Sequence, residues 1–405
     1  MNPVAKPSNP NPSVSKNAAV KDWSWPFWYL VPIYPYNQKR TIRIEVVKDW
    51  IWTFEQVQGI FYVVVPIRMT VIRLEKGGLL VYAPVAPTPE CIRLMQELVA
   101  QYGEVKYIIL PTISGLEHKV SVGPFARYFP IAQIFVAPNQ WSFPVNLPLS
   151  WLGFPKERTQ ILPFDSSKTP FFDEFDYAIL GPIDLRLGQF GEVAFFHRRS
   201  QTLLVTDLVI SLPEKPPAVL ALDPYPLLFH AKDKASDAIQ DNESDRIKGW
   251  QRICLFALYF QASSLEVPHW LAVWQDSREA ADHSLKAYFG LFPLKWKKDW
   301  QQTFDTLRGG GRLLVAPILQ QLILNRQPQE TLNWANKIAT WDFSRLISCH
   351  FDAPVTVKPE EFRQAFSFLE KSCPASQRLP VKDLATLQKI DQFLYRWKIT
   401  PPPKH

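Results

Sequence analysis

Cysteine is scarce in this sequence of 405 residues, and no long apolar run is present. The four cysteines are widely spaced and form no C-x-x-C pair, a pattern typical of reduced thiols rather than of a disulfide framework. No run of about eighteen apolar residues occurs, so no transmembrane helix is predicted. The start of the chain also lacks the apolar core of a signal peptide. We therefore expect a cytoplasmic protein.

Charge of one sign does not dominate the chain, because the net charge is only +7. That balance permits an anionic partner without requiring one. Residues 295–300 interleave lysine with tryptophan, as some nucleic-acid and membrane-binding segments do. A solvated helix start explains them more simply, so a nucleic-acid partner is not expected. Hydrophobic content of 47% and charged content of 20% are ordinary for a folded protein.

The N-terminal part is rich first in proline and asparagine and then in aromatic residues. Residues 1–22 are predicted to be a disordered tail. Residues 23–44 carry tryptophans and tyrosines interrupted by prolines, which excludes one long helix. This aromatic arm either packs over the domain, which we favour, or lies at a membrane interface.

The middle of the chain alternates short strands and helices. Strands are predicted at 61–65, 69–74 and 79–82, then a helix that starts with the N-cap Thr88 and ends before Gly103, then a strand at 105–110. This order is typical of the first half of an αββα sandwich. Later ranges are predicted as follows: strands at 177–180, 193–196 and 203–205, and short or amphipathic helices at 124–129, 247–259, 313–324, 332–338, 359–371 and 381–397.

One motif follows the strand at 105–110. Residues 112–118 read Thr-Ile-Ser-Gly-Leu-Glu-His and resemble the T-H-x-H-x-D-H signature of the metallo-β-lactamase family. Ile113 and Gly115 stand where that family has its first two histidines. Glu117 replaces the aspartate, and His118 matches the last histidine.

The resemblance also implies where the rest of a metal-binding set lies. The strand ending in Asp207 resembles the one that carries the family's bridging aspartate, and the strand ending in His350 resembles the one with the final histidine. A looser match over residues 187–195 puts Gly188 at the third histidine position. In that family, one metal ion (site one) is bound by the first two histidines of the motif and the third histidine. The resemblance therefore implies that site one has no side-chain donor here. The other ion (site two) is bound at the four remaining positions, and each of these keeps a donor: Glu117, His118, Asp207 and His350. Two imidazoles and two carboxylates suit one divalent Zn, Mn or Fe ion.

Most of residues 45–360 also resembles an uncharacterised family of cyanobacteria and plant plastids, whose members look like divergent metallo-β-lactamase-like proteins. The segments that carry this resemblance are 125–127 with 136–144, 192–207 and 349–354. It implies an α/β fold of the metallo-β-lactamase-like αββα type and brings no established activity. The expected organisation is a core of 45–210 with 341–358, a mostly helical insertion at 211–340, and C-terminal helices in 359–405.

Two functional hypotheses remain open. The first is a scaffold or interaction protein that binds one metal ion at the site-two position, with a protein or membrane-surface partner on the helical insertion or the aromatic arm. The second is a mononuclear metal-dependent hydrolase of an ester, thioester or phosphoester. The sequence assigns no catalytic residue, and Cys349 should point away from His350 because adjacent strand residues face opposite sides.

Overall fold

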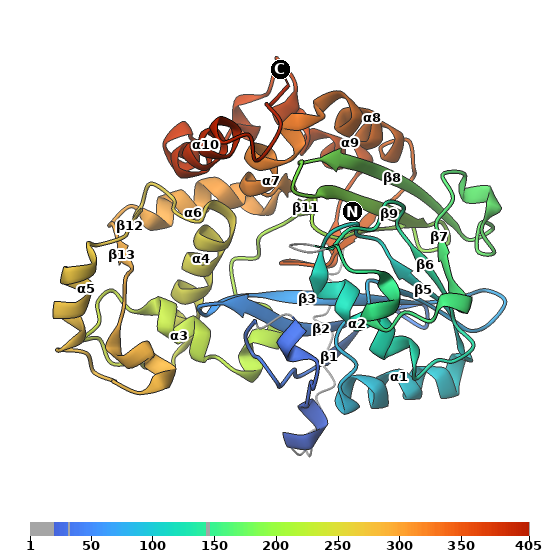
Figure 1. The fold of residues 1–405 in the computed structure, drawn as a ribbon, viewed down its shortest axis with the longest axis horizontal. Coiled ribbons are helices and arrows are strands. Elements are labelled where there is room, and N and C mark those ends of the chain that lie inside the picture. The colour runs from blue at the N-terminus through green and yellow to red at the C-terminus, as the bar shows by residue number, and fades with distance from the viewer. Residues whose placement is uncertain (1–19, 31–32, 143–145, 405) are drawn as a thin grey trace, which may run out of the picture.

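The computed structural model describes residues 20–30, 33–142 and 146–404, so most of the predicted tail lies outside the described residues. Two mixed β-sheets form its centre (Figure 1). The first sheet follows chain order, with antiparallel pairs up to β4 and parallel pairs after it. Its strands are β1 (Ile42–Val47), β2 (Ile51–Ile60), β3 (Val63–Arg73), β4 (Leu79–Tyr82), β5 (Val105–Leu110), β6 (Gln133–Val136) and β7 (Thr159–Ile161).

The second sheet has the order β16-β15-β10-β9-β8. Its strands are β8 (Phe175–Asp184), β9 (Gln189–His197), β10 (Thr202–Val205), β15 (Arg345–Ser348) and β16 (Val355–Thr356). Although β10 and β15 lie far apart in the sequence, they pair in parallel, with Val205 opposite Ser348. Their carboxyl ends therefore meet at one edge of the sheet.

The two sheets pack face to face over an apolar layer contributed by both, including Ile109, Phe195 and Leu204. Helices α1 (Pro89–Tyr102) and α2 (Leu116–Ala126) cover the outer face of the first sheet. Helices α8 (Pro328–Ile338) and α9 (Pro359–Gln364) cover the second, where the Trp334 indole N–H donates to the Ala178 carbonyl at 3.0 Å. The predicted αββα sandwich is confirmed (Figure 1).

The chain between β10 and β15 is mostly helical and returns to the same sheet. Besides α8 it contains α3 (Tyr225–Ala231), α4 (Glu243–Tyr259), α5 (Trp270–Ser277), α6 (Trp300–Arg308) and α7 (Pro317–Leu322), with short strand pairs β11 (Val209–Ile210) with β14 (Leu314–Val315) and β12 (Leu265–Glu266) with β13 (Lys295–Trp296). Helix α4 packs beside β3 of the first sheet, and the C-terminal α10 (Val381–Arg396) packs on α7 and α4 (Figure 1).

Several element predictions were wrong in position. The predicted strand at 61–65 contains a hairpin turn, because Phe61 and Tyr62 have positive φ and join β2 to β3. The helix predicted at 124–129 begins earlier, at Leu116. The helix predicted from 313 starts at Pro317, since Leu314 and Val315 pair with β11 instead. Strands β1 and β2 were not predicted.

The described part of the arm packs against the domain. Trp25 is buried, the Arg40 guanidinium lies over the Trp23 ring, and the Glu90 carboxylate of α1 accepts the Thr41 N–H at 2.7 Å. The four cysteines are free. Within the described ranges, no helix is both long and apolar enough to cross a membrane.

Candidate metal centre

Four polar side chains meet where strands of both sheets end. Glu117 and His118 lie in the first turn of α2, just after β5, whereas Asp207 follows β10 and His350 follows β15. One ligand atom from each of Glu117, His118 and His350 lies within 4.8 Å of the other two. Asp207 adjoins them, because its Oδ1 is 2.9 Å from His350 Nε2. The structure thus brings together all four residues that the sequence singled out, as expected for a site at strand ends.

Both imidazoles are oriented by their outer nitrogens. His118 Nδ1 donates to the Pro84 carbonyl at 3.0 Å, and His350 Nδ1 donates to the Pro66 carbonyl at 2.8 Å. This arrangement leaves the Nε2 of each ring as the inner donor atom, as in many metal-bound histidines. His118 Nε2 is buried and has no hydrogen-bond partner. A buried polar atom without a partner is costly, so this nitrogen is available to an added ligand such as a metal ion.

The Glu117 carboxylate is divided between two neighbours. Its Oε2 accepts a hydrogen bond from Gln58 Nε2 at 2.6 Å, while its Oε1 lies 3.3 Å from His350 Nε2. Gln58, on β2, therefore fixes the carboxylate so that Oε1 faces the cluster. Sequence reasoning missed Gln58, because β2 and α2 are distant in the sequence and meet only in the folded chain, which leaves no local signal.

Asp207 is positioned by a second buried carboxylate, that of Glu192 on β9. Glu192 accepts the backbone N–H groups of Thr206, Asp207 and Leu208 at 2.7, 2.9 and 3.1 Å. Burial, together with the charge of Asp207, raises the pKa of Glu192 to about 7 despite these hydrogen bonds. Sequence reasoning also missed this residue, although one acid within the apolar run of β9 was an available signal.

The loop that carries His350 is held by a buried ion pair. Arg68 Nε contacts Glu55 Oε1 at 2.7 Å, and both side chains are almost fully buried. The same guanidinium donates to the carbonyls of Ser348 and Phe351, on either side of His350. Arg68, on β3, therefore connects the first sheet to the loop that contains His350.

The charges of the cluster are strongly coupled. Burial opposes charge on His350, yet the carboxylates of Glu117 and Asp207 raise its pKa well above the ordinary value. Burial likewise opposes charge on Glu117, but His350 lowers its pKa to about 2. Burial lowers the pKa of His118, which stays neutral. Two carboxylates with one imidazolium leave a net negative site, which attracts a cation.

Ile113 and Gly188, two of the positions that the resemblance assigns to site one, are packed against apolar atoms. A Cβ added to Gly191 would lie 2.3 Å from Ile113 Cδ1, and one added to Gly188 would lie 2.8 Å from Cζ3 of the Trp141 ring. Lys119 Nζ donates to the Ile113 carbonyl at 2.6 Å, and burial lowers its pKa to about 7. Among the described residues, only the cluster of Glu117, His118 and His350 converges as a metal-binding group.

Two other buried histidines and Cys349 are not part of this cluster. His230 Nε2 contacts the Phe61 carbonyl at 3.2 Å, at the hairpin turn, and His197 Nδ1 contacts Ser200 Oγ at 2.8 Å. Cys349 is buried, and burial raises the pKa of its thiol.

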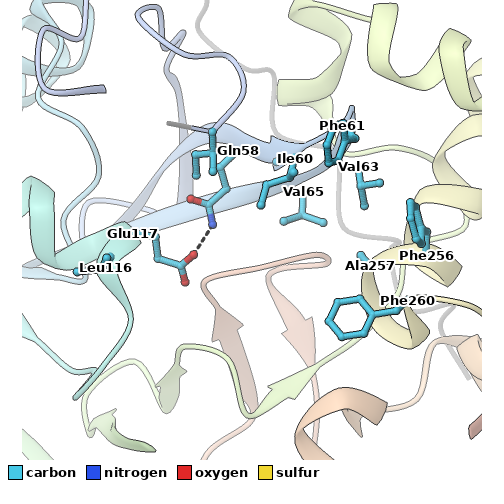
Figure 2. Close-up of a pocket in the computed structure, with 12 residues that line it drawn as sticks. Gln58, Ile60, Phe61, Val63, Val65, Leu116, Glu117, Phe256, Ala257 and Phe260 are labelled. Carbon is cyan, nitrogen blue, oxygen red and sulfur yellow. Dashed lines mark hydrogen bonds between the residues drawn. The ribbon is translucent and has the colours of Figure 1, made fainter. Parts of the chain in front are cut away.

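A pocket of about 540 Å³ opens beside the cluster, and Glu117 lines it (Figure 2). The pocket lies between α2, the β2–β3 hairpin and α4, so both the core and the insertion contribute walls. The charged centre therefore adjoins a space of the size that small ligands occupy.

Similar solved structures have low sequence identity. The metal-soaked Flv1 flavodiiron core from Synechocystis sp. PCC6803 is 11% identical with a TM-score of 0.40, covering 82% of this chain and 62% of its own. The DIM-1 metallo-β-lactamase exposed to ceftazidime is 13% identical with a TM-score of 0.33, covering 54% and 83%. A flavoprotein from Thermotoga maritima is 8% identical with a TM-score of 0.40, covering 82% and 61%. This chain thus spans less than two thirds of the flavodiiron protein.

Among curated proteins, none matches the sequence. The family model described as "Domain of unknown function (DUF4336)" matches residues 48–368, which include both sheets apart from β1 and also the whole candidate centre. The chain therefore belongs to the DUF4336 family.

Proposed function

We propose that the protein binds one divalent metal ion through Glu117, His118 and His350, with Asp207 as a fourth donor. The observation that carries this proposal is the buried, unpartnered Nε2 of His118, which shares one small space with His350 and Glu117. Two imidazole nitrogens and two carboxylates suit Zn, Mn or Fe. The proton on His350 that now bridges Glu117 and Asp207 would leave when the ion enters.

A hydrolytic role is favoured over a purely structural one by the pocket beside Glu117. Bound at this position, a divalent ion supplies polarisation of a carbonyl or phosphoryl oxygen and a water of lowered pKa. Glu117 and Asp207 are each partly exposed, with 25% of the side chain accessible, so one of these two carboxylates could accept a proton from a water instead of serving as a metal ligand. Gln58 holds Glu117 in one orientation for that role. The proposed activity is hydrolysis of an ester, thioester or phosphoester.

Elemental mass spectrometry of the purified protein after dialysis against a weak chelator tests the metal proposal. About one ion per chain is expected, and a His118→Ala/His350→Ala variant should lose it. His269→Ala is the matched control, because this histidine is exposed in the insertion. Absence of metal from the unaltered protein, even after reloading with Zn, Mn or Fe, would contradict the proposal and favour the scaffold hypothesis.

Hydrolysis requires a separate test with metal-loaded protein and chromogenic esters, thioesters and phosphodiesters. Glu117→Gln should abolish turnover that the unaltered protein shows. Full metal content without turnover on any class would leave metal binding in place and reject the hydrolytic role.

A further inference from the structure

The pocket beside the centre is apolar except at one end. Among the described residues that line it, Gln58 and Glu117 are the only ones with polar side chains. Figure 2 shows these two at one end of the pocket and Phe256, Ala257 and Phe260 at the other. Aliphatic side chains of β2 and β3 lie between the two ends. A ligand that fills this space needs a polar group at Glu117 and an apolar body that extends towards α4.

The rim of the pocket exposes apolar side chains to solvent. Ile60 is 60% exposed, Phe61 is 68% exposed and Phe260 is 42% exposed. Phe61 and Phe260 also have positive φ values of 50° and 59°, which bulky residues seldom adopt. Backbone strain of this kind persists where the surrounding structure enforces it, and it gathers at ligand-binding positions.

The strained turn is stabilised by Tyr62, the residue that follows Phe61 in it. Its ring packs within 5.1 to 5.3 Å of four aromatic rings, those of Tyr34, Tyr225, Phe229 and Tyr288. With Tyr62 anchored inwards, Phe61 is left at the rim. The packing of Tyr62 therefore fixes the conformation of the hairpin that exposes Phe61 at the rim.

The chemistry of the walls selects among the ester classes of the proposed function. No Lys or Arg is among the described residues that line the pocket, so it offers no partner for a phosphate or nucleotide body. Apolar walls that lead away from a single polar end match an alkyl chain attached to a carbonyl group.

We infer that this pocket holds the acyl chain of an ester or thioester substrate whose carbonyl lies at Glu117. The inference rests on the proposed metal-dependent hydrolase. The insertion then acts as a specificity element, because α4 lines the end of the pocket that receives the chain terminus.

Isothermal titration calorimetry with acyl hydroxamates tests the inference, since their head group chelates divalent ions. Affinity should increase from aceto- to hexano- to octanohydroxamate, by roughly fourfold for each methylene that becomes buried. Ala257→Trp, which fills the pocket, should remove this increase. Ser244→Trp is the matched control, because it places the same indole on an exposed position of the same helix.

Metal content is measured on each protein in parallel, which separates the two proposals. A chain-length increase that Ala257→Trp abolishes supports the acyl pocket, whether or not metal is retained. If the unaltered protein holds no metal, the proposed function is contradicted, but the increase of affinity with chain length is still expected in the metal-free protein. Equal affinities across the series, or an increase that persists in Ala257→Trp, would overturn the inference even in fully loaded protein.

Discussion

The carboxylate of Glu192 lies beneath Asp207 and accepts its backbone N–H at 2.9 Å. Because Glu192 also binds the N–H groups on either side of Asp207, one side chain sets the path of the whole loop after β10. The position of Asp207 relative to His350 therefore depends on a residue that is not itself a candidate metal ligand.

Replacing Glu192 by Gln should weaken metal binding by roughly 10- to 100-fold, as losses of outer-shell partners do. The amide offers one acceptor oxygen instead of two, so at least one backbone N–H of the loop loses its partner. Competition with a chromogenic chelator measures the change. Glu174→Gln serves as control, because Glu174 also accepts a backbone N–H, from Glu75, but lies in the turn before β8 and outside the cluster. Equal metal affinity in both variants would argue against the positioning role.

Restoring histidines to the motif should not create a second metal site. In Ile113→His/Gly115→His, the third ligand is still absent, because Gly188 is covered by the Trp141 ring. The new imidazole at 113 would also replace a fully buried side chain that packs on Gly191, at a cost of about 1–3 kcal/mol in unfolding free energy. Metal stoichiometry and urea denaturation measure both effects. Two ions per chain would show that the apolar filling does not exclude site one.

Removing one partner of the buried pair Arg68–Glu55 should be strongly destabilising. Arg68→Met leaves the Glu55 carboxylate buried without its partner and frees the loop of His350, so a loss of about 3–5 kcal/mol is expected. The double variant Arg68→Met/Glu55→Met removes the unpaired charge and should recover much of that loss. Chemical denaturation of both single variants and the double variant gives the coupling. Additive effects would mean that the pair does not act as a unit.

The buried His197 should make the protein sensitive to mild acid. Burial lowers its pKa from 6.5 to about 4. Between pH 6.5 and about 4, this histidine is therefore protonated in the unfolded chain but neutral in the folded chain. Stability is complete above about pH 6.5 and falls by about 3 kcal/mol as the pH drops to about 4. His197→Phe, in a site already flanked by Phe175 and Trp50, should flatten this slope. Denaturation curves across the pH range provide the measurement, and parallel slopes in both proteins would contradict it.

The four candidate ligands were identified by the resemblance to the metallo-β-lactamase signature, and two of them, Asp207 and His350, also follow short apolar runs. The side chains that orient them were not. Gln58 and Arg68 act through contacts with residues far away in the sequence, which leave no local pattern, whereas Glu192 was marked only as an acid within an apolar run. The turn at Phe61 and Tyr62 was hidden for a different reason, since aromatic residues favour strands and the usual glycine or asparagine of a tight hairpin is absent.

The ring contacts of Tyr62 join three parts of the chain that are distant in sequence. Tyr34 belongs to the arm, Phe61 and Tyr62 to the core hairpin, and Tyr225, Phe229 and Tyr288 to the insertion. None of these parts can open without breaking packing in the other two. Their amide hydrogens should therefore exchange with solvent as one cooperative unit. A ligand that binds at the pocket rim should then also slow amide exchange in the arm.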